Sequence, residues 1–255
     1  MKQSNVVAIL IFLLLISKSL CAQQTQVIAH RGYWKTKGAA PNSLIALLKA
    51  DEINCYGAEF DVYLTADDEL VVNHDKKYKG VVFEEASCSV TTSIELDNGE
   101  SLPSLQQYLK LAKLLDIKLI LEFKVNKLSE ERQTLGIQKI LEMVREYVLE
   151  ERMEYIAFSL YATKEFVRLA PKGTPVYYLK GNLSPKELKE IGCAGADYSQ
   201  KILEQHPTWI KECHDLGLKV NVWTVNDEEN MRKFINEGVD FITTDEPLMF
   251  QCIKE

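Results

Sequence analysis

Two histidines in this chain stand where short apolar runs end. His30 follows Val27–Ala29, and His74 comes two residues after Leu70–Val72. Imidazole titrates near neutral pH, so one histidine can take up a proton while the other gives one. A single histidine is more often a hydrogen-bonded core residue, but two at converging strand ends favour an acid–base pair. No role is assigned to the other two histidines, His206 and His214.

Three carboxylates accompany these histidines in a pattern that suits a cation. Glu59 and Asp61 are two residues apart in a run typical of a β-strand, so both point to the same side. Neighbouring carboxylates repel one another unless something positive lies between them. Glu122, near the end of another apolar run, adds a third oxygen donor, and three such donors suit one divalent cation, Mg²⁺ or Ca²⁺. The alternative is an ion-pair network in which Arg31 and Lys124 balance the acids.

Local cations and one aromatic side chain complete the candidate site. Arg31 can hold a phosphate through two parallel hydrogen bonds, and Lys124 supplies a point charge. Trp223 ends a late apolar run and could line a substrate pocket or lie against a choline-type head group, with core packing as the alternative. An acid–base pair, a cation site and two basic side chains together suit the cleavage of a phosphate ester.

Apolar runs that alternate with amphipathic helical patterns predict the elements that position these residues. Because each run is apolar throughout, the alternation indicates a buried parallel sheet. Eight runs are the number that closes an α/β TIM barrel, (β/α)8, whose active sites lie at the carboxyl ends of the strands. The expected strands are Val27–Ala29, Ala58–Tyr63, Lys118–Phe123, Tyr155–Phe158, Pro175–Leu179, Ala196–Tyr198, Lys219–Thr224 and Phe241–Thr243.

A short extra strand and an insertion follow the second strand. Leu70–Val72 is expected to pair with that strand as a β-hairpin, with residues 66–69 as the turn. Residues 76–100 are polar and lack a clear period, so we expect an irregular insertion over one end of the barrel. Nothing marks a domain boundary, and we expect residues 23–255 to form a single domain.

The first 22 residues have the pattern of a secretory signal peptide. A basic start precedes about eleven apolar residues, too few for a comfortable membrane span, and the small residues Cys21-Ala22 follow. We therefore expect a secreted or periplasmic protein that has no stable membrane span after cleavage. A second interpretation makes Cys21 the lipidated residue of a lipoprotein.

Charge and cysteine content narrow the class of partner. The chain has 255 residues and a net charge of −7. An acidic protein does not hold nucleic acid by bulk electrostatics, so we expect a small-molecule phosphodiester substrate bound at a local positive centre. The six cysteines are scattered and contain no Cys-x-x-Cys pair, which argues against a zinc module and favours buried free thiols over one or two disulfides. Oligomeric state is left open.

Several segments resemble the glycerophosphodiester phosphodiesterase family. His30-Arg31-Gly32 resembles its opening motif. The segment from Glu59-Phe60-Asp61 to Asn73-His74-Asp75 resembles its longest signature. Further matches are Leu102-Pro103-Ser104-Leu105, Leu121-Glu122-Phe123-Lys124, Val222-Trp223-Thr224-Val225-Asn226 and Thr244-Asp245-Glu246-Pro247.

The resemblance implies a β/α barrel, a divalent cation and a reaction. A glycerophosphodiester and water would give glycerol 3-phosphate and an alcohol. The resemblance leaves open which histidine is the acid, which cation binds, and whether a cyclic phosphate forms on the way. It implies that Glu59, Asp61 and Glu122 hold the cation, that His30 and His74 transfer protons, and that Arg31 and Lys124 bind the phosphate.

Two loops depart from the family pattern. Pro41-Asn42-Ser43 stands where the family usually has Glu-Asn-Thr, and we expect Asn42 to cap the following helix. Residues 76–80 replace a common Arg-Thr-Thr stretch, so the preferred alcohol is open. Two other functions are also open. One is a phospholipase D-like enzyme that acts on lysophospholipid or sphingomyelin and needs an apolar groove. The other is a secreted, non-catalytic binding protein.

Overall fold

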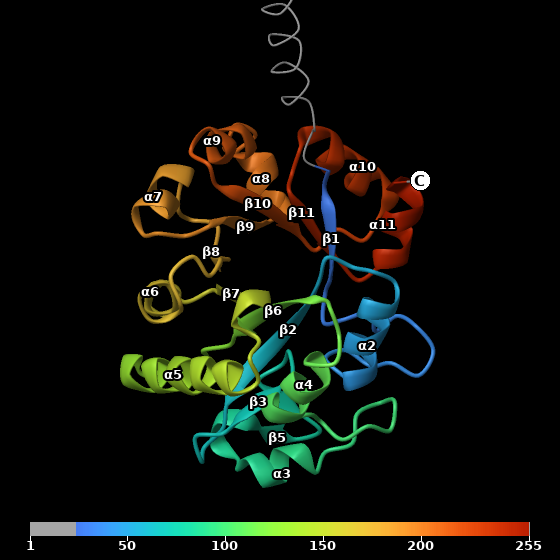
Figure 1. The fold of residues 1–255 in the computed structure, drawn as a ribbon, viewed down its shortest axis with the longest axis vertical. Coiled ribbons are helices and arrows are strands. Elements are labelled where there is room, and N and C mark those ends of the chain that lie inside the picture. The colour runs from blue at the N-terminus through green and yellow to red at the C-terminus, as the bar shows by residue number, and fades with distance from the viewer. Residues whose placement is uncertain (1–23, 255) are drawn as a thin grey trace, which may run out of the picture.

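The computed structural model describes residues 24–254 and contains a closed barrel of parallel strands. The first strand closes the barrel by pairing with both the second and the last strand. Helices surround the strands on the outside (Figure 1). This is the expected TIM barrel, and every predicted strand is present. The barrel strands are β1 (Gln26–Ala29), β2 (Gly57–Leu64), β6 (Lys118–Phe123), β7 (Met153–Ala157), β8 (Val176–Tyr178), β9 (Gly195–Ser199), β10 (Lys219–Trp223) and β11 (Phe241–Thr244).

Serine residues cap several of the surrounding helices. Ser43 accepts a hydrogen bond from the Ala46 backbone N–H at the start of α2, so the expectation that Asn42 caps this helix is wrong. Two short 3₁₀ turns lie at Phe83–Glu85 and Glu150–Arg152. The helices are α2 (Leu44–Glu52), α3 (Cys88–Thr92), α4 (Leu105–Ala112), α5 (Glu130–Glu146), α6 (Leu160–Leu169), α7 (Pro185–Glu190), α8 (Gln200–Gln205), α9 (Trp209–Asp215), α10 (Glu228–Glu237) and α11 (Pro247–Lys254).

Alternation along β2 and β6 decides which side chains reach the barrel interior. Phe60 points outward and stacks on Tyr108 of α4, with ring centroids 4.3 Å apart. The residues on either side, Glu59 and Asp61, therefore point inward. β2 and β6 pair in a register that places Asp61 opposite Glu122. Strand pairing thus brings together carboxylates that are far apart in the sequence.

A cluster of buried apolar side chains lies inside the barrel below the predicted site. Ile28, Ile120 and Phe241 belong to a buried cluster inside the barrel. Along the chain, the three residues precede His30, Glu122 and Asp245, respectively. Because all barrel strands run in the same direction, the predicted site residues gather at the carboxyl ends, beyond this cluster.

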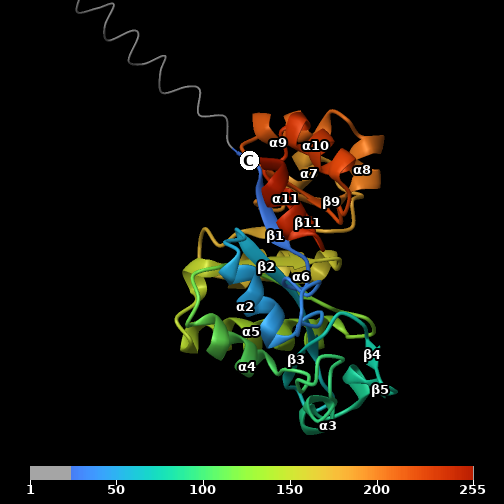
Figure 2. The same ribbon diagram turned by 90° about the vertical axis from the view of Figure 1, so that its right-hand side faces the viewer.

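The insertion after β2 is more ordered than its sequence indicates. β3 (Leu70–Val72) pairs antiparallel with β2 as the expected hairpin. Residues 76–100, expected to be irregular, instead contain a two-stranded sheet, β4 (Lys77–Tyr78) and β5 (Val81–Val82), and helix α3. Figure 2 shows this segment projecting beside β3, far from α8 and α10. Its few apolar residues lack a period but pack into a separate cluster of Ala40, Tyr63, Val71, Phe83, Ile94, Leu96 and Leu102.

Several predictions made from the sequence concern residues outside the predicted site. His206 follows α8 and stacks on Trp209, and His214 Nε2 lies 3.0 Å from Asp240 Oδ2. The cysteines among residues 24–254 are unpaired. Within that range no helix has the length and apolar character needed to cross a membrane. The expected signal peptide, including Cys21, lies outside the described residues.

Candidate active site

A pocket of about 170 Å³ opens at the carboxyl ends of the barrel strands. Seven of the eight predicted site residues line it, and they come from segments that are far apart in the sequence. The eighth, Asp61, is fully buried, and its Oδ1 lies 3.1 Å from Lys124 Nζ. The fold therefore gathers the predicted residues in one place. Those that line the pocket are His30, Arg31, Glu59, His74, Glu122, Lys124 and Trp223.

An aspartate that was not among the predicted site residues holds His30. His30 Nδ1 lies 2.8 Å from Asp245 Oδ1. Trp34 Nε1 and Asn226 Nδ2 donate hydrogen bonds to the same carboxylate, at 3.1 and 2.7 Å. Burial opposes the charge on Asp245, but the hydrogen bond and charge of His30 outweigh it and lower the pKa of Asp245 to about 2. His30 Nε2 remains free for chemistry and lies 4.0 Å from Glu59 Oε2.

His74 is fixed through both its ring and its backbone. Its Nδ1 lies 2.9 Å from Asp75 Oδ1, and the Tyr63 hydroxyl donates a hydrogen bond to its carbonyl oxygen. Burial lowers the pKa of His74, although the nearby Asp61 charge opposes this. The rings of His30 and His74 have centroids 6.4 Å apart and planes at 82°. Both can therefore reach one small group bound in the pocket.

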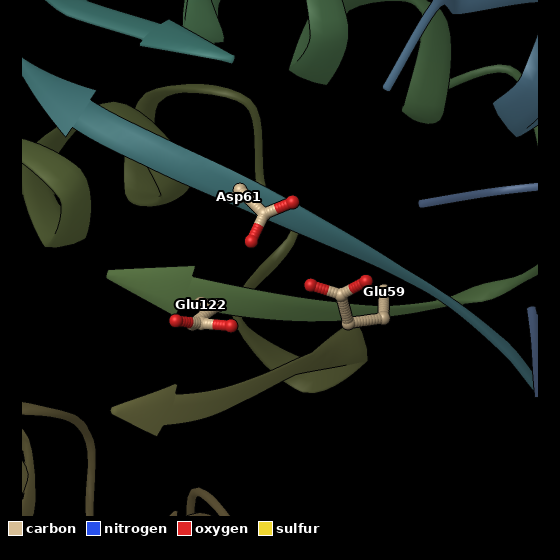
Figure 3. Close-up of side chains that lie close together, drawn as sticks. All are labelled: Glu59, Asp61 and Glu122. Atoms are coloured by element: carbon tan, nitrogen blue, oxygen red, sulfur yellow. The ribbon is translucent and has the colours of Figure 1, made fainter. Parts of the chain in front are cut away.

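Glu59, Asp61 and Glu122 point toward one another from β2 and β6 (Figure 3). One oxygen from each lies within 4.8 Å of the others. Glu59 Oε1 is buried and has no hydrogen-bond partner among residues 24–254. Burial, with the charges of Asp61 and Glu122, raises the pKa of Glu59 well above its usual range. Burial, with the charge of Asp61, raises the pKa of Glu122 to about 7. Crowded carboxylates with an unsatisfied oxygen suit a divalent cation.

Lys124 balances part of this negative cluster. Its Nζ lies 3.1 Å from Asp61 Oδ1 and 2.8 Å from Glu122 Oε1. Burial opposes the charge on Lys124, but the two carboxylates outweigh it and raise the pKa of Lys124. Burial likewise opposes the charge on Asp61, but Lys124, His74 and the hydrogen bond from Asn42 together outweigh it and lower the pKa of Asp61. The ion pair leaves Glu59 Oε1 without a partner in the described part of the chain, so the structure fits a cation site better than a complete ion-pair network.

Asn42 holds Asp61 in place. Asn42 Nδ2 donates to Asp61 Oδ2 at 2.8 Å, and the Asp61 backbone N–H donates to Asn42 Oδ1 at 3.1 Å. Asn42 has a φ of 63°, in the left-handed region that asparagine tolerates. Its neighbour Ser43 caps α2 instead. The sequence signal for this role of Asn42 was that Asn42 and Ser43 are adjacent and both suited to capping. Only one of them can cap the helix, so the other is available for a different contact.

A tight turn places Arg31 beside the carboxylates. The Arg31 backbone N–H donates to Glu59 Oε2 at 2.8 Å, and Gly32 has a φ of 73°. A side chain at Gly32 would meet the Ala46 backbone at 2.7 Å, so the turn requires glycine. Arg31 Nε is buried without a hydrogen-bond partner in the described part of the chain. This guanidinium is therefore available to an anion in the pocket.

Two further pocket residues, Asp197 and Phe158, were not predicted. Asp197 points into the barrel from β9 and accepts a hydrogen bond from Asn221 Nδ2 at 2.8 Å. Burial raises the pKa of Asp197 to about 8. Phe158 packs edge-on against Trp223, whose Nε1 donates to the Asp197 carbonyl oxygen. Alternation along Ala196–Tyr198 was the signal that could have identified Asp197, since an aspartate there faces inward.

Comparison with known proteins agrees with this architecture. The model of the glycerophosphoryl diester phosphodiesterase family matches residues 30–249. A glycerophosphodiester phosphodiesterase of Caldanaerobacter subterraneus subsp. tengcongensis is 28% identical over 238 residues, which cover 88% of this chain and 95% of the relative. The crystal structure of such an enzyme from Parabacteroides distasonis superposes with a TM-score of 0.88 and 49% identity, over 91% of this chain and 97% of that chain.

A more distant structure shares the fold. A phosphodiesterase from Oleispira antarctica, solved in complex with the product sn-glycerol-3-phosphate, has a TM-score of 0.78 and 22% identity. The alignment covers 91% of this chain and 97% of that chain. Since the family model spans most of the sequence, including every residue of the site, this chain belongs to the glycerophosphoryl diester phosphodiesterase family.

Proposed function

We propose that this chain is a metal-dependent phosphodiesterase that hydrolyses glycerophosphodiesters to glycerol 3-phosphate and an alcohol, with two histidines transferring the protons. One observation carries the proposal: the rings of His30 and His74 lie 6.4 Å apart in the pocket that contains the carboxylate cluster. Family membership supports the reaction class. The Oleispira antarctica structure, which holds sn-glycerol-3-phosphate as its product, supports the proposed product.

Proton transfer is assigned to the two histidines. His74 is the proton acceptor, because burial lowers its pKa and so favours the neutral ring. It would deprotonate either water or a neighbouring glycerol hydroxyl. His30 then gives a proton to the departing alcohol from Nε2, while Asp245 keeps Nδ1 occupied and fixes the ring. Each histidine is thus held at Nδ1, which leaves Nε2 for the substrate.

Arg31 and Lys124 bind the phosphate in this proposal. Arg31 offers a buried Nε that has no hydrogen-bond partner among the described residues, and Lys124 carries a positive charge at the pocket wall. Trp223 and Phe158 form an aromatic corner of the pocket that would pack against substrate carbon atoms. These side chains orient the diester so that its scissile bond lies between the histidines.

Glu59, Asp61 and Glu122 would hold one divalent cation, Mg²⁺ or Ca²⁺, through carboxylate oxygens. When bound, such a cation neutralises negative charge that develops on a transferring phosphate. Asn42 and the Arg31 backbone N–H keep two of the three carboxylates in position.

Turnover assays test the proposal. Glycerol 3-phosphate release from glycerophosphocholine and glycerophosphoethanolamine is measured with and without chelator. We expect chelator to abolish release, and we expect His74→Gln to lower kcat by about 10²–10⁴-fold. His206→Gln, outside the pocket, is the matched control and retains activity. Full activity in chelator would contradict the metal role.

The same assay separates the alternative functions. Choline release from lysophosphatidylcholine, without turnover of glycerophosphocholine, would indicate the phospholipase D-like enzyme. Diester binding without any turnover would indicate the binding protein. We also propose secretion or periplasmic location, supported by the signal-like residues 1–22. Mass spectrometry of the exported protein should find Gln23 at its amino terminus, whereas a lipidated Cys21 would indicate a lipoprotein.

A further inference from the structure

A second groove opens beside the active-site pocket. Its volume is about 450 Å³, against about 170 Å³ for the pocket. The two cavities share Glu122, Lys124 and Phe158, so the groove begins at the lysine that is proposed to bind phosphate. We call it the side groove, and its other polar lining residues are Tyr63, Asn126, Gln133, Ser159 and Lys180.

Segments that follow three neighbouring barrel strands build the side groove. Asn126 follows β6, Ser159 follows β7 and Lys180 follows β8. Ser159 Oγ donates to Gln133 Oε1 at 2.8 Å, and Gln133 Nε2 donates to the Leu128 carbonyl oxygen at 3.0 Å. These bonds fix one wall. The side groove is therefore a formed cavity on the same face of the barrel as the pocket.

The side groove has an excess of positive charge and hydrogen-bond donors. Lys180 is exposed and forms no ion pair with any residue from 24 to 254. Asn126 is also exposed, and its side chain forms a hydrogen bond with the Tyr63 hydroxyl. The one carboxylate that lines the groove, Glu122, already lies 2.8 Å from Lys124 Nζ and belongs to the candidate cation site. Lys180 is thus free to bind a ligand, and Asn126 lies exposed at the same groove.

A phosphodiester has two ester arms, and the two cavities meet where its phosphate would lie. With the phosphate on Arg31 and Lys124, one arm would enter the pocket, whose wall includes Trp223 and Phe158. That apolar wall suits the carbon backbone of the glycerol arm. The other arm would pass Lys124 into the side groove. The larger and more open cavity would then receive the group that leaves.

We propose that the side groove binds the leaving alcohol, and that Lys180 and Asn126 select an uncharged polyhydroxyl alcohol, such as inositol or glycerol, over a quaternary ammonium alcohol such as choline. This inference rests on the proposed function. Ammonium and amide N–H groups donate to hydroxyl oxygens. A trimethylammonium group accepts no hydrogen bond and is repelled by the charge of Lys180.

The test compares kcat/KM for glycerophosphoinositol, glycerophosphoglycerol and glycerophosphocholine. All three release glycerol 3-phosphate, so one coupled assay measures them alike. We expect the wild-type enzyme to prefer the two polyhydroxyl diesters, and we expect Lys180→Glu to shift that preference toward choline by about tenfold. Asn126→Asp should shift it in the same direction. Lys172→Glu, an exposed lysine before the amino end of β8, is the control and leaves the preference unchanged.

The outcomes separate this inference from the proposed function. An active Lys180→Glu enzyme with wild-type preference overturns the side-groove assignment and leaves the hydrolase intact. An equal loss on all three diesters also overturns it, since that pattern indicates a general effect on catalysis. A wild-type enzyme that releases glycerol 3-phosphate from none of them contradicts the proposed function, and the side-groove assignment with it.

Discussion

His30 and Asp245 form a hydrogen-bonded pair across the start and end of the barrel, with Nδ1 and Oδ1 2.8 Å apart and the two residues 215 positions apart in the chain. Pairing of β1 with β11 creates this contact, since Ala29 lies opposite Thr244. Trp34 and Asn226 hold the aspartate from two other sides. Asp245 therefore acts through His30 and is a positioning residue.

Replacing Asp245 with asparagine tests this role. The Asp245→Asn variant keeps the shape of the side chain but loses the negative charge that fixes the tautomer and orientation of His30. We expect kcat to fall by about 10–100-fold with KM nearly unchanged. Asp75→Asn is the matched control, because the partner of His74 is 73% exposed and its loss should cost far less. An Asp245→Asn enzyme with wild-type kcat over the whole pH range would contradict the assignment.

The sequence was sufficient to predict where the site lies. Strand runs bounded by polar residues identified the barrel strands, and the two-residue spacing of Glu59 and Asp61 fixed their common direction. Both features depend on local backbone geometry, which the pattern of residues in one sequence is enough to predict. The carboxyl-end rule of the barrel then placed Glu122 and Trp223 at the same mouth.

Contacts between side chains from distant parts of the chain could not be predicted from the sequence. Asp245 lies in one of the segments that resemble the family, but its contact with His30 depends on barrel closure. Asn42 and Ser43 are equally suited to capping, and only the turn geometry decides between them. The insertion at residues 76–100 folds around scattered apolar residues that have no period, so its order comes from tertiary packing rather than local pattern.

Metal binding should stabilise the folded protein. Because Glu59 Oε1 is buried and has no hydrogen-bond partner in residues 24–254, a cation there relieves repulsion within the cluster. At a Ca²⁺ or Mg²⁺ concentration of about 100 times Kd, we expect stabilisation of about 2.7 kcal/mol. Thermal denaturation with metal and with chelator measures this. Glu59→Gln should lose the shift and Glu237→Gln, an exposed control, should keep it. An equal shift in both variants would place the cation elsewhere.

Asn42 should control cation affinity through Asp61. Removing its two hydrogen bonds frees the carboxylate to rotate, and we expect Asn42→Gly to weaken cation binding by about tenfold. Asn42→Ala should weaken it equally but also lower the free energy of unfolding by a further ~1–2 kcal/mol, because alanine disfavours a φ of 63°. Calorimetric titration and denaturant unfolding separate the two effects. Wild-type affinity in the glycine variant would show that Asp61 is positioned without Asn42.

Asp197 should make stability depend on pH. Burial raises its pKa from an ordinary value of 3.8 to about 8, so between these values the folded chain holds a proton that the unfolded chain has lost. The stability contributed by the neutral carboxyl is therefore complete below about pH 4 and is lost as the pH rises toward about 8. Asp197→Asn is neutral throughout and can keep the hydrogen bond from Asn221.

Denaturant unfolding in chelator, from about pH 5 to about pH 9, tests this dependence. The wild type should lose more stability over that range than Asp197→Asn, by on the order of a few kcal/mol, since each unit of pKa shift corresponds to about 1.4 kcal/mol. Asp116→Asn, at an exposed site, should follow the wild-type curve. Parallel curves for the wild type and Asp197→Asn would mean that the barrel interior accommodates a charged carboxylate at this position, through contacts stronger than the single hydrogen bond from Asn221.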